Sequence, residues 1–304
     1  MRLYSILLFA LGISSCRITS EDRGNEMSSI ISDVGIPKKI HQVWIGQDKE
    51  PDYNQYYKES MSKHAPNHEY KLWTNKDLTR ENFPIVYDYI LQASEAGKRK
   101  YGVDPKMWNG TPTRKLAQIS DLMRLEIIYH HGGFYFDVKT ELLKSIDHLS
   151  TPNISFVVAN EDPCGLTCKS GNKLYLSNSI FASAPNSKIL QRLLKKDRLE
   201  QIKFDRDEVN EETGPFYFRS GILNANEVHL LKTDEAFPYI SWTSPYQKAG
   251  VDRCLSKERD SLKTSDDHVK TIIIKNETVY LEYPCEKYPT SLLVMHWNLG
   301  GTWK

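Results

Sequence analysis

The chain has 304 residues, of which 39% are hydrophobic and 26% charged, a composition that excludes a disordered or fibrous protein. Its length suits one α/β catalytic domain with a sizeable core. Lys and Arg total 40 against 39 Asp and Glu, so the formal net charge is +1. Without a global positive field no nucleic-acid partner is expected, and an anionic ligand must be held by a local site.

Residues 1–16 have the pattern of an export signal. Met1 and Arg2 precede the apolar run Ser5–Ile13, which is too short to span a bilayer. Ile13–Cys16 resembles a bacterial lipobox, whose cysteine becomes lipidated and anchors the protein to a membrane. The alternative is an ordinary secretory signal. We therefore expect an exported protein, either anchored through Cys16, secreted or in a secretory-pathway lumen.

Four cysteines remain after Cys16, namely Cys164, Cys168, Cys254 and Cys285. In an exported chain they suggest two disulfides, for which three pairings exist. A zinc site is the competing interpretation, but Cys254 and Cys285 lie far apart and lack the spacing of paired zinc ligands.

A polar segment, residues 17–34, separates the signal from one predicted catalytic domain, residues 35–304. Hydrophobic periodicity predicts the elements of the domain. The predicted strands are Ile40–Ile45, Tyr70–Trp73, Phe134–Val138, Ile154–Ala159, Ile180–Ala184, Val269–Ile274 and Thr278–Tyr283. The predicted helices are Tyr53–His64, Phe83–Ala96, Leu116–Tyr129 and Ser187–Lys196. This alternation indicates an α/β fold with a mostly parallel sheet flanked by helices and an antiparallel C-terminal extension.

The helix 115–129 carries two charged residues at helical spacing. Asp121 and Arg124 lie three residues apart and are neighbours on the helix surface. A surface ion pair is the simple explanation, and it stabilises a protein by well under about 1 kcal/mol. However, the helix leads directly into a strand, so its last turns border the crevice at a strand end, where open α/β sheets bind ligands.

The segment HHGGFYFDVKTE, residues 130–141, contains the next candidate. Gly132 and Gly133 allow a tight turn and close approach of a ligand to the backbone. Asp137 follows where the strand should end. It either forms a turn with its own backbone or is a carboxylate held at a rigid strand end to bind a ribose hydroxyl or a metal on a diphosphate.

Six segments, in order, resemble glycosyltransferase family 32, the DXD-containing sugar transferases related to yeast α-1,6-mannosyltransferases, bacterial capsule enzymes and, distantly, clostridial glucosylating toxins. The segments are IPKKIHQVWIG, YKLWTNKDL, QISDLMRLEIIYHHGGFYFDVKTE, SNSIFASAPNSKIL, ETGPFY and HWNLGGTWK. The resemblance implies a GT-A fold and a retaining hexosyltransferase. The donor would be a UDP- or GDP-linked sugar and the acceptor a glycan, lipid or protein.

The resemblance also implies the donor site. Trp44 would lie near the base, with Trp73 beside it, and Asp121 and Arg124 would contact the donor sugar and diphosphate. Asp137 matches the first Asp of the DXD motif, a ligand of Mn²⁺ or Mg²⁺. The C-terminal residues expected to close over the donor are His296, Thr302 and Trp303.

The chain departs from the family at Lys139, which stands where the second Asp of the DXD motif is expected. An ammonium group cannot ligate a metal. Three interpretations remain open. In the first, Lys139 takes the place of the cation, and Arg124, His296 and Trp303 help to stabilise the diphosphate. Alternatively, Glu141 supplies the missing ligand, if the strand continues and places residues 137, 139 and 141 on one face. In the third, the site is catalytically silent and only binds nucleotide or carbohydrate.

Overall fold

The computed structural model describes residues 35–47, 50, 54–162, 175–222, 225, 228–237, 269–274, 277–282 and 291–295. Within these residues, six strands form the central sheet in the order β2-β1-β3-β6-β5-β7. They are β1 (Lys39–Val43), β2 (Glu69–Trp73), β3 (Gly133–Phe136), β5 (Phe156–Asp162), β6 (Tyr175–Ser183) and β7 (His229–Leu231). β6 is antiparallel to both of its neighbours, β3 and β5, whereas the other neighbouring strands are parallel.

The sheet is buried on both faces because alternate residues of its strands enter two different hydrophobic clusters. In β3, Tyr135 packs into one cluster, and Phe134 and Phe136 pack into the other. In β5, Val158 packs into the same cluster as Tyr135, and Val157 packs into the same cluster as Phe134 and Phe136. The continuous apolar runs of the sequence are therefore the pattern of strands covered on both sides.

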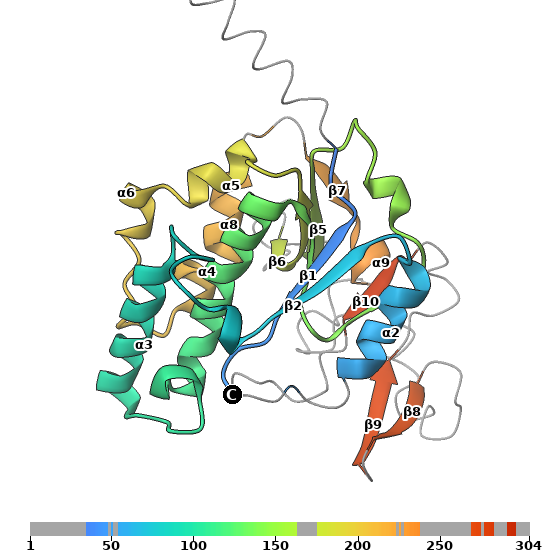
Figure 1. Ribbon diagram of the computed structural model, residues 1–304. Coiled ribbons are helices and arrows are strands. Elements are labelled where there is room, and N and C mark those ends of the chain that lie inside the picture. Colours follow the sequence, from blue (N-terminus) through green and yellow to red (C-terminus); the bar gives the residue numbers. More distant parts are fainter. Residues whose placement is uncertain are drawn as a thin grey trace, which may run out of the picture.

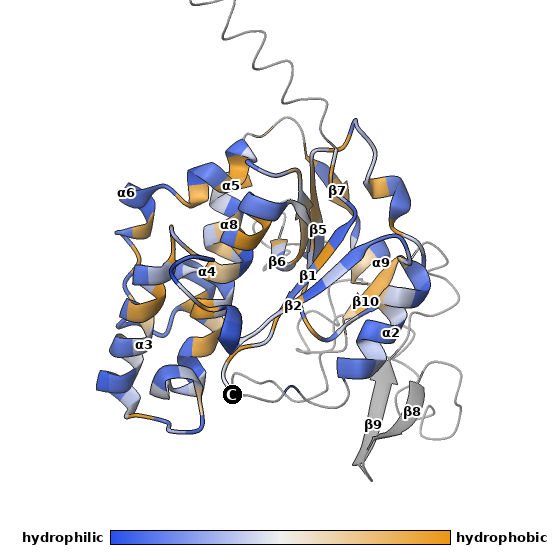
Figure 2. Ribbon diagram, viewed as in Figure 1, coloured by the Kyte–Doolittle hydropathy of each residue, from blue (hydrophilic) through white to orange (hydrophobic). Residues whose placement is uncertain are grey.

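Figure 1 shows a helical layer on one side of the sheet and a smaller, mixed layer on the other. The helical layer consists of α3 (Tyr87–Tyr101), α4 (Thr113–His131), α5 (Lys188–Leu193), α6 (Lys196–Leu199), α7 (Val209–Glu212) and α8 (Pro215–Ile222). The mixed layer consists of α2 (Asn54–His64), α9 (Thr233–Ala236) and the antiparallel pair β4 (Thr140–Leu142) and β10 (Leu293–Met295). In Figure 2, β10 is orange along its length, whereas the helices carry both blue and orange residues.

Further along the chain, β8 (Val269–Ile274) and β9 (Glu277–Glu282) form an antiparallel hairpin. Short 3-10 turns occupy Asn75–Asp77, Trp108–Gly110 and Asp147–Leu149.

Two glycines join α4 to β3. Gly132 and Gly133 have φ angles of 62° and 94°, in the region that side chains disfavour. A Cβ on Gly133 would lie 2.6 Å from the Lys39 carbonyl oxygen of β1. The turn predicted from the two glycines is therefore present, and it sets how α4 meets the edge of the sheet.

The predicted α/β fold, with a mostly parallel sheet flanked by helices and antiparallel strands toward the C-terminus, is confirmed. Several predicted boundaries were wrong. Strand β1 ends at Val43 instead of Ile45, and β3 ends at Phe136 instead of Val138. Helix α3 begins at Tyr87, four residues after the predicted start at Phe83.

Several predictions concern residues outside the described ranges. They are the signal 1–16 with its lipobox Cys16, the linker 17–34, the four cysteines of the predicted disulfides, and His296, Thr302 and Trp303. In the part of the chain that the structure does describe, no helix is both long and apolar enough to cross a membrane.

Candidate functional site

Strands β1, β3 and β6 bring candidate residues to one edge of the sheet. β1 and β3 are parallel, with His41 opposite Tyr135, so their C-terminal ends meet at this edge. β6 is antiparallel and pairs Ile180 with Phe136, so Asn178, two residues earlier on β6, extends beyond the end of β3. The Asp137 backbone N–H donates to the Ser179 carbonyl at 2.9 Å, which fixes Asp137 beside β6.

Arg124 of α4 is buried against this edge, with its side chain only 6% exposed. Its Nη1 donates to the Asn178 carbonyl at 2.9 Å, and its Nε and Nη2 donate to the Ser120 carbonyl and hydroxyl at 3.3 and 3.1 Å. The guanidinium carbon lies 4.6 Å from the centre of the Tyr135 ring, in cation–π contact. The guanidinium donors are therefore largely used within the protein.

Asp121 lies one helical turn before Arg124 and is also buried. One carboxylate oxygen accepts from the Asn178 side-chain amide at 2.8 Å and the other from the Thr213 hydroxyl at 2.9 Å. Burial raises the pKa of Asp121 to about 6, although Arg124, 3.4 Å away, and the Thr213 hydroxyl favour the ionised carboxylate. The pair predicted as neighbours on α4 thus belongs to a buried network rather than to the surface.

Asp137 connects this network to solvent, because its side chain is 32% exposed. Its Oδ1 accepts from the Tyr135 hydroxyl at 2.8 Å and lies 3.3 Å from Nη1 of Arg124. Burial alone lowers the pKa of Arg124, but the negative charges of Asp137 and Asp121 outweigh it and raise this pKa overall. The predicted group of Asp121, Arg124 and Asp137 is thus brought together by the fold.

Lys139 lies in a tight turn next to Asp137. The Thr140 N–H donates to the Asp137 carbonyl at 2.9 Å, which closes a four-residue turn. The Lys139 side chain is half-buried, and this burial lowers its pKa, while the nearby charge of Asp137 raises it. The side-chain amide of Gln42 on β1 donates to the same Asp137 carbonyl at 3.2 Å, so the turn is held against the end of β1.

One interpretation of the sequence required Glu141 to share a strand face with Asp137. The structure does not place the two residues on one strand. The strand ends at Phe136, and Glu141 belongs to β4, which pairs with β10 in a separate sheet. Its side chain is buried and accepts from the Tyr56 hydroxyl of α2 at 2.7 Å. The chain therefore offers Asp137 no neighbouring carboxylate at the DXD spacing.

Among the described residues, the donor set at this edge does not fit a divalent cation. Mn²⁺ and Mg²⁺ prefer several oxygen ligands. In the part of the chain that is described, no group of three or more His, Cys, Asp or Glu side chains could hold a metal ion. Asp137 has Lys139 as its neighbour in the turn and already accepts two contacts at Oδ1.

The two tryptophans predicted to line the donor site lie in different environments. Trp44 follows β1, and its half-buried side chain has a buried Nε1 without a hydrogen-bond partner among the described residues. Trp73 is 2% exposed, and its Nε1 donates to Nδ1 of His41 at 3.1 Å. It also packs against the rings of Phe83 and His131. Trp44 therefore lies one residue beyond the strand end, whereas Trp73 is part of the core.

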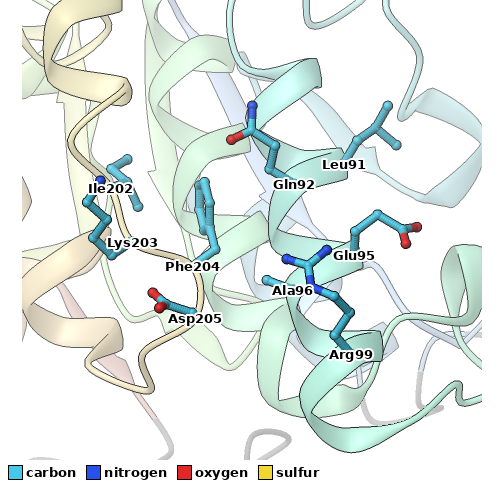
Figure 3. A pocket seen from close by; sticks show the side chains of 9 residues that line it. All are labelled: Leu91, Gln92, Glu95, Ala96, Arg99, Ile202, Lys203, Phe204 and Asp205. Atoms are coloured by element: carbon cyan, nitrogen blue, oxygen red, sulfur yellow. The ribbon is translucent and has the colours of Figure 1, made fainter.

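A cavity lies in the helical layer, between α3 and residues 202–205. Figure 3 shows side chains of α3 facing those of residues 202–205 across a cavity of about 490 Å³. Its lining includes Leu91, Arg99 and Phe204, and it contains none of the predicted site residues.

Three residues of the site were not singled out from the sequence. Asn178, Thr213 and Gln42 lie in quoted segments, SNSIFASAPNSKIL, ETGPFY and IPKKIHQVWIG, but no role was predicted for them. Each contacts the α4–β3 corner across many residues of sequence. The only signal available in the sequence was that these polar residues lie within the quoted segments.

A buried carboxylate–arginine pair at a strand end, with a second carboxylate facing solvent, is an arrangement suited to binding a sugar diphosphate on an α/β sheet. The chain matches the family model "Glycosyltransferase sugar-binding region containing DXD motif" over residues 51–156. This match includes Asp121, Arg124, Asp137 and Lys139. Residues 51–156 are thus similar to a glycosyltransferase sugar-binding region of the DXD type, which supports the resemblance to glycosyltransferase family 32.

The chain is similar to inositol phosphoceramide mannosyltransferase 2 of Schizosaccharomyces pombe, with 24% identity over 165 residues. The aligned part is 53% of this chain and 38% of the yeast protein, so the chain matches well under half of that relative. A solved structure, PaToxG glycosyltransferase, has a TM-score of 0.43 at 18% identity, covering 66% of this chain and 76% of that one. The fold assignment therefore rests on the strand order described above.

Proposed function

We propose that this protein is a retaining glycosyltransferase that transfers a sugar from a UDP- or GDP-linked donor to a glycan, lipid or protein acceptor. The observation that carries the proposal is the Asp121–Arg124–Asp137 group at the C-terminal edge of the sheet, within the matched sugar-binding region. Asp137 is the only one of the three that reaches solvent appreciably, so it is the residue we assign to donor contact.

Retention requires no protein nucleophile at this site. The acceptor hydroxyl approaches the face of the sugar from which the diphosphate departs. The bond from the anomeric carbon to the phosphate oxygen breaks, the bond to the acceptor oxygen forms, and the hydroxyl proton moves to the departing phosphate. The protein orients both substrates and stabilises charge on the diphosphate. Arg124 acts here by holding Asp137, while His296, Thr302 and Trp303 remain predicted contacts.

The proposal is tested by incubating the purified protein with a panel of UDP- and GDP-sugars and measuring release of the free nucleoside diphosphate. At least one donor should be turned over. Asp137→Asn should lower that turnover about 100-fold or more, the scale of losing one charge-positioning group in a catalytic site. Nuclear magnetic resonance of the released or transferred sugar should show the anomeric configuration of the donor.

Asp147→Asn is the matched control, because it removes a carboxylate that binds Lys38 on the surface at 2.9 Å. It should leave turnover unchanged. Absence of turnover with every donor, accompanied by measurable binding of UDP or GDP, would instead support the second candidate, a catalytically silent nucleotide- or carbohydrate-binding protein. Lys139 at the second DXD position is the observation that favours this candidate. Absence of both turnover and binding would reject both.

A further inference from the structure

Among the described residues of the site, two cationic side chains stand against two carboxylates. Arg124 and Lys139 are cations, and Asp121 and Asp137 are the carboxylates that face them. A site that holds a divalent cation needs several oxygen ligands, and an excess of carboxylates favours the bound cation. Replacing one of the two carboxylates by a lysine changes the formal charge of the motif from −2 to zero. The motif therefore presents no excess negative charge to a cation.

The two cations differ in what they can reach. The Arg124 side chain is 6% exposed, and its guanidinium donates to Ser120 and Asn178 and contacts both carboxylates. Lys139 is only half-buried and lies in the turn directly after the solvent-facing Asp137. Its four-carbon stem and three donors suit contact with a phosphate group. Of these two cations, Lys139 is the one at the surface of the site.

The turn that carries Lys139 is fixed in place. The Asp137 carbonyl accepts from the Thr140 N–H and from the Gln42 side chain, and the Asp137 N–H donates to β6. Its position is therefore set by three strands, which is what a preorganised charge requires. The metal-ligand role of Glu141 has no such support, because Glu141 lies on β4 and its carboxylate accepts from the Tyr56 hydroxyl of α2.

We infer that Lys139 replaces the divalent cation of the DXD motif, so that this protein binds the diphosphate of its donor without a metal ion. The inference rests on the proposed function, because it assigns the charge partner of the same donor. An ammonium group at this position neutralises the charge that develops on the departing diphosphate, which is the electrostatic task a metal otherwise performs.

The test is binding of UDP and of GDP to the full chain by isothermal titration calorimetry, in chelator and in Mn²⁺. The wild-type dissociation constant should be the same in both. Lys139→Met should weaken binding about 10- to 100-fold in either condition, the scale of a lost charged hydrogen bond. Lys139→Arg should retain most of the affinity because it keeps the charge. Lys196→Met, at an α6 side chain that is 83% exposed, is the matched control and should bind like the wild type.

Lys139→Asp separates a metal substitute from a lysine that only holds the turn. It restores two carboxylates at DXD spacing, so binding should weaken in chelator and recover when Mn²⁺ is added. Thermal unfolding of each variant identifies any that fail to fold. Wild-type binding that requires Mn²⁺, or a Lys139→Met protein that folds and binds normally, would overturn the inference while leaving the proposed function intact. If neither nucleotide binds in any condition, the proposed function fails and the inference fails with it.

Discussion

Asp121 shows how a buried charge is held at the residue scale. Its two carboxylate oxygens accept from Asn178 and Thr213, and Arg124 lies beside it. Asp121→Ala should lower the free energy of unfolding by about 3–5 kcal/mol, because it leaves a buried cation with one partner fewer. Asp121→Asn also removes the negative charge beside Arg124, but it keeps one oxygen acceptor and the side-chain volume, so it should cost about 1–2 kcal/mol less than Asp121→Ala. Denaturant unfolding measures both values, and equal costs would show that the retained oxygen and volume contribute nothing.

The sequence predicted part of this network and missed the rest for a physical reason. Asp121 and Arg124 are three residues apart on one helix, so their proximity follows from helix geometry alone. Asn178 and Thr213 reach Asp121 across 57 and 92 residues, which requires the register of β6 against β3 and the position of α7. The strand end predicted at Val138 was wrong for a local reason, because the hydrogen bond from the Thr140 N–H to the Asp137 carbonyl closes a turn that ends the strand.

At the scale of elements, α4 stabilises the start of α3. Glu126 is fully buried, and its two carboxylate oxygens accept from the N–H groups of Ile85 and Val86, each at 2.8 Å. The N-cap Val86 has no side chain that could make these bonds. A carboxylate at a helix N-terminus satisfies unpaired N–H groups and interacts favourably with the helix dipole. Burial raises the pKa of Glu126 despite these bonds.

We expect Glu126→Gln to lower the free energy of unfolding by about 1–3 kcal/mol, because one amide N–H₂ must then face a backbone N–H. Hydrogen exchange should quicken at the first turn of α3 more than elsewhere. Glu200→Gln is the control, since Glu200 is 56% exposed in an ion pair with Lys196, and it should change stability by less than about 0.5 kcal/mol. Equal effects of the two substitutions would argue against the capping role.

Helices α3 and α4 show that apolar spacing in the sequence predicts where a helix lies but not the residue at which it begins. The apolar spacing correctly predicted both helices, but it placed the start of α3 at Phe83 instead of Tyr87. The true start depends on Glu126, which lies 40 residues from Val86 in sequence. A cap supplied by another helix leaves no signature in the segment that it caps.

At the scale of the whole molecule, the buried side chain of His41 on β1 links β2 to the α4–β3 turn. Its Nδ1 accepts from the indole of Trp73, so its Nε2 carries the proton and donates to the Gly132 carbonyl at 3.1 Å. Burial, and then the neighbouring His131, lower the pKa of His41 from 6.5 to about 3. A proton on Nδ1 would face the indole N–H, so protonation is incompatible with this contact.

The pH dependence of stability follows from this depressed pKa. Between pH 6.5 and about 3 the unfolded chain binds a proton at this histidine and the folded chain does not, so lowering the pH favours unfolding. The stabilisation due to His41 is therefore complete above pH 6.5 and is lost as the pH falls, by at most about 1.4 kcal/mol per pH unit. Asp121 has the opposite sign, because its folded pKa of about 6 exceeds its ordinary value of 3.8.

His41→Gln separates these contributions, since glutamine can still accept from Trp73 and donate to Gly132 but does not titrate. Denaturant unfolding of wild type and variant should be compared at each pH from 8 to 4, so that Asp121 and the other titrating groups cancel in the difference. The wild type should exceed the variant by a constant amount above pH 6.5, and this margin should shrink steadily below it. A margin that stays constant down to pH 4 would mean that His41 accepts its proton without breaking the link between β1, β2 and the α4–β3 turn.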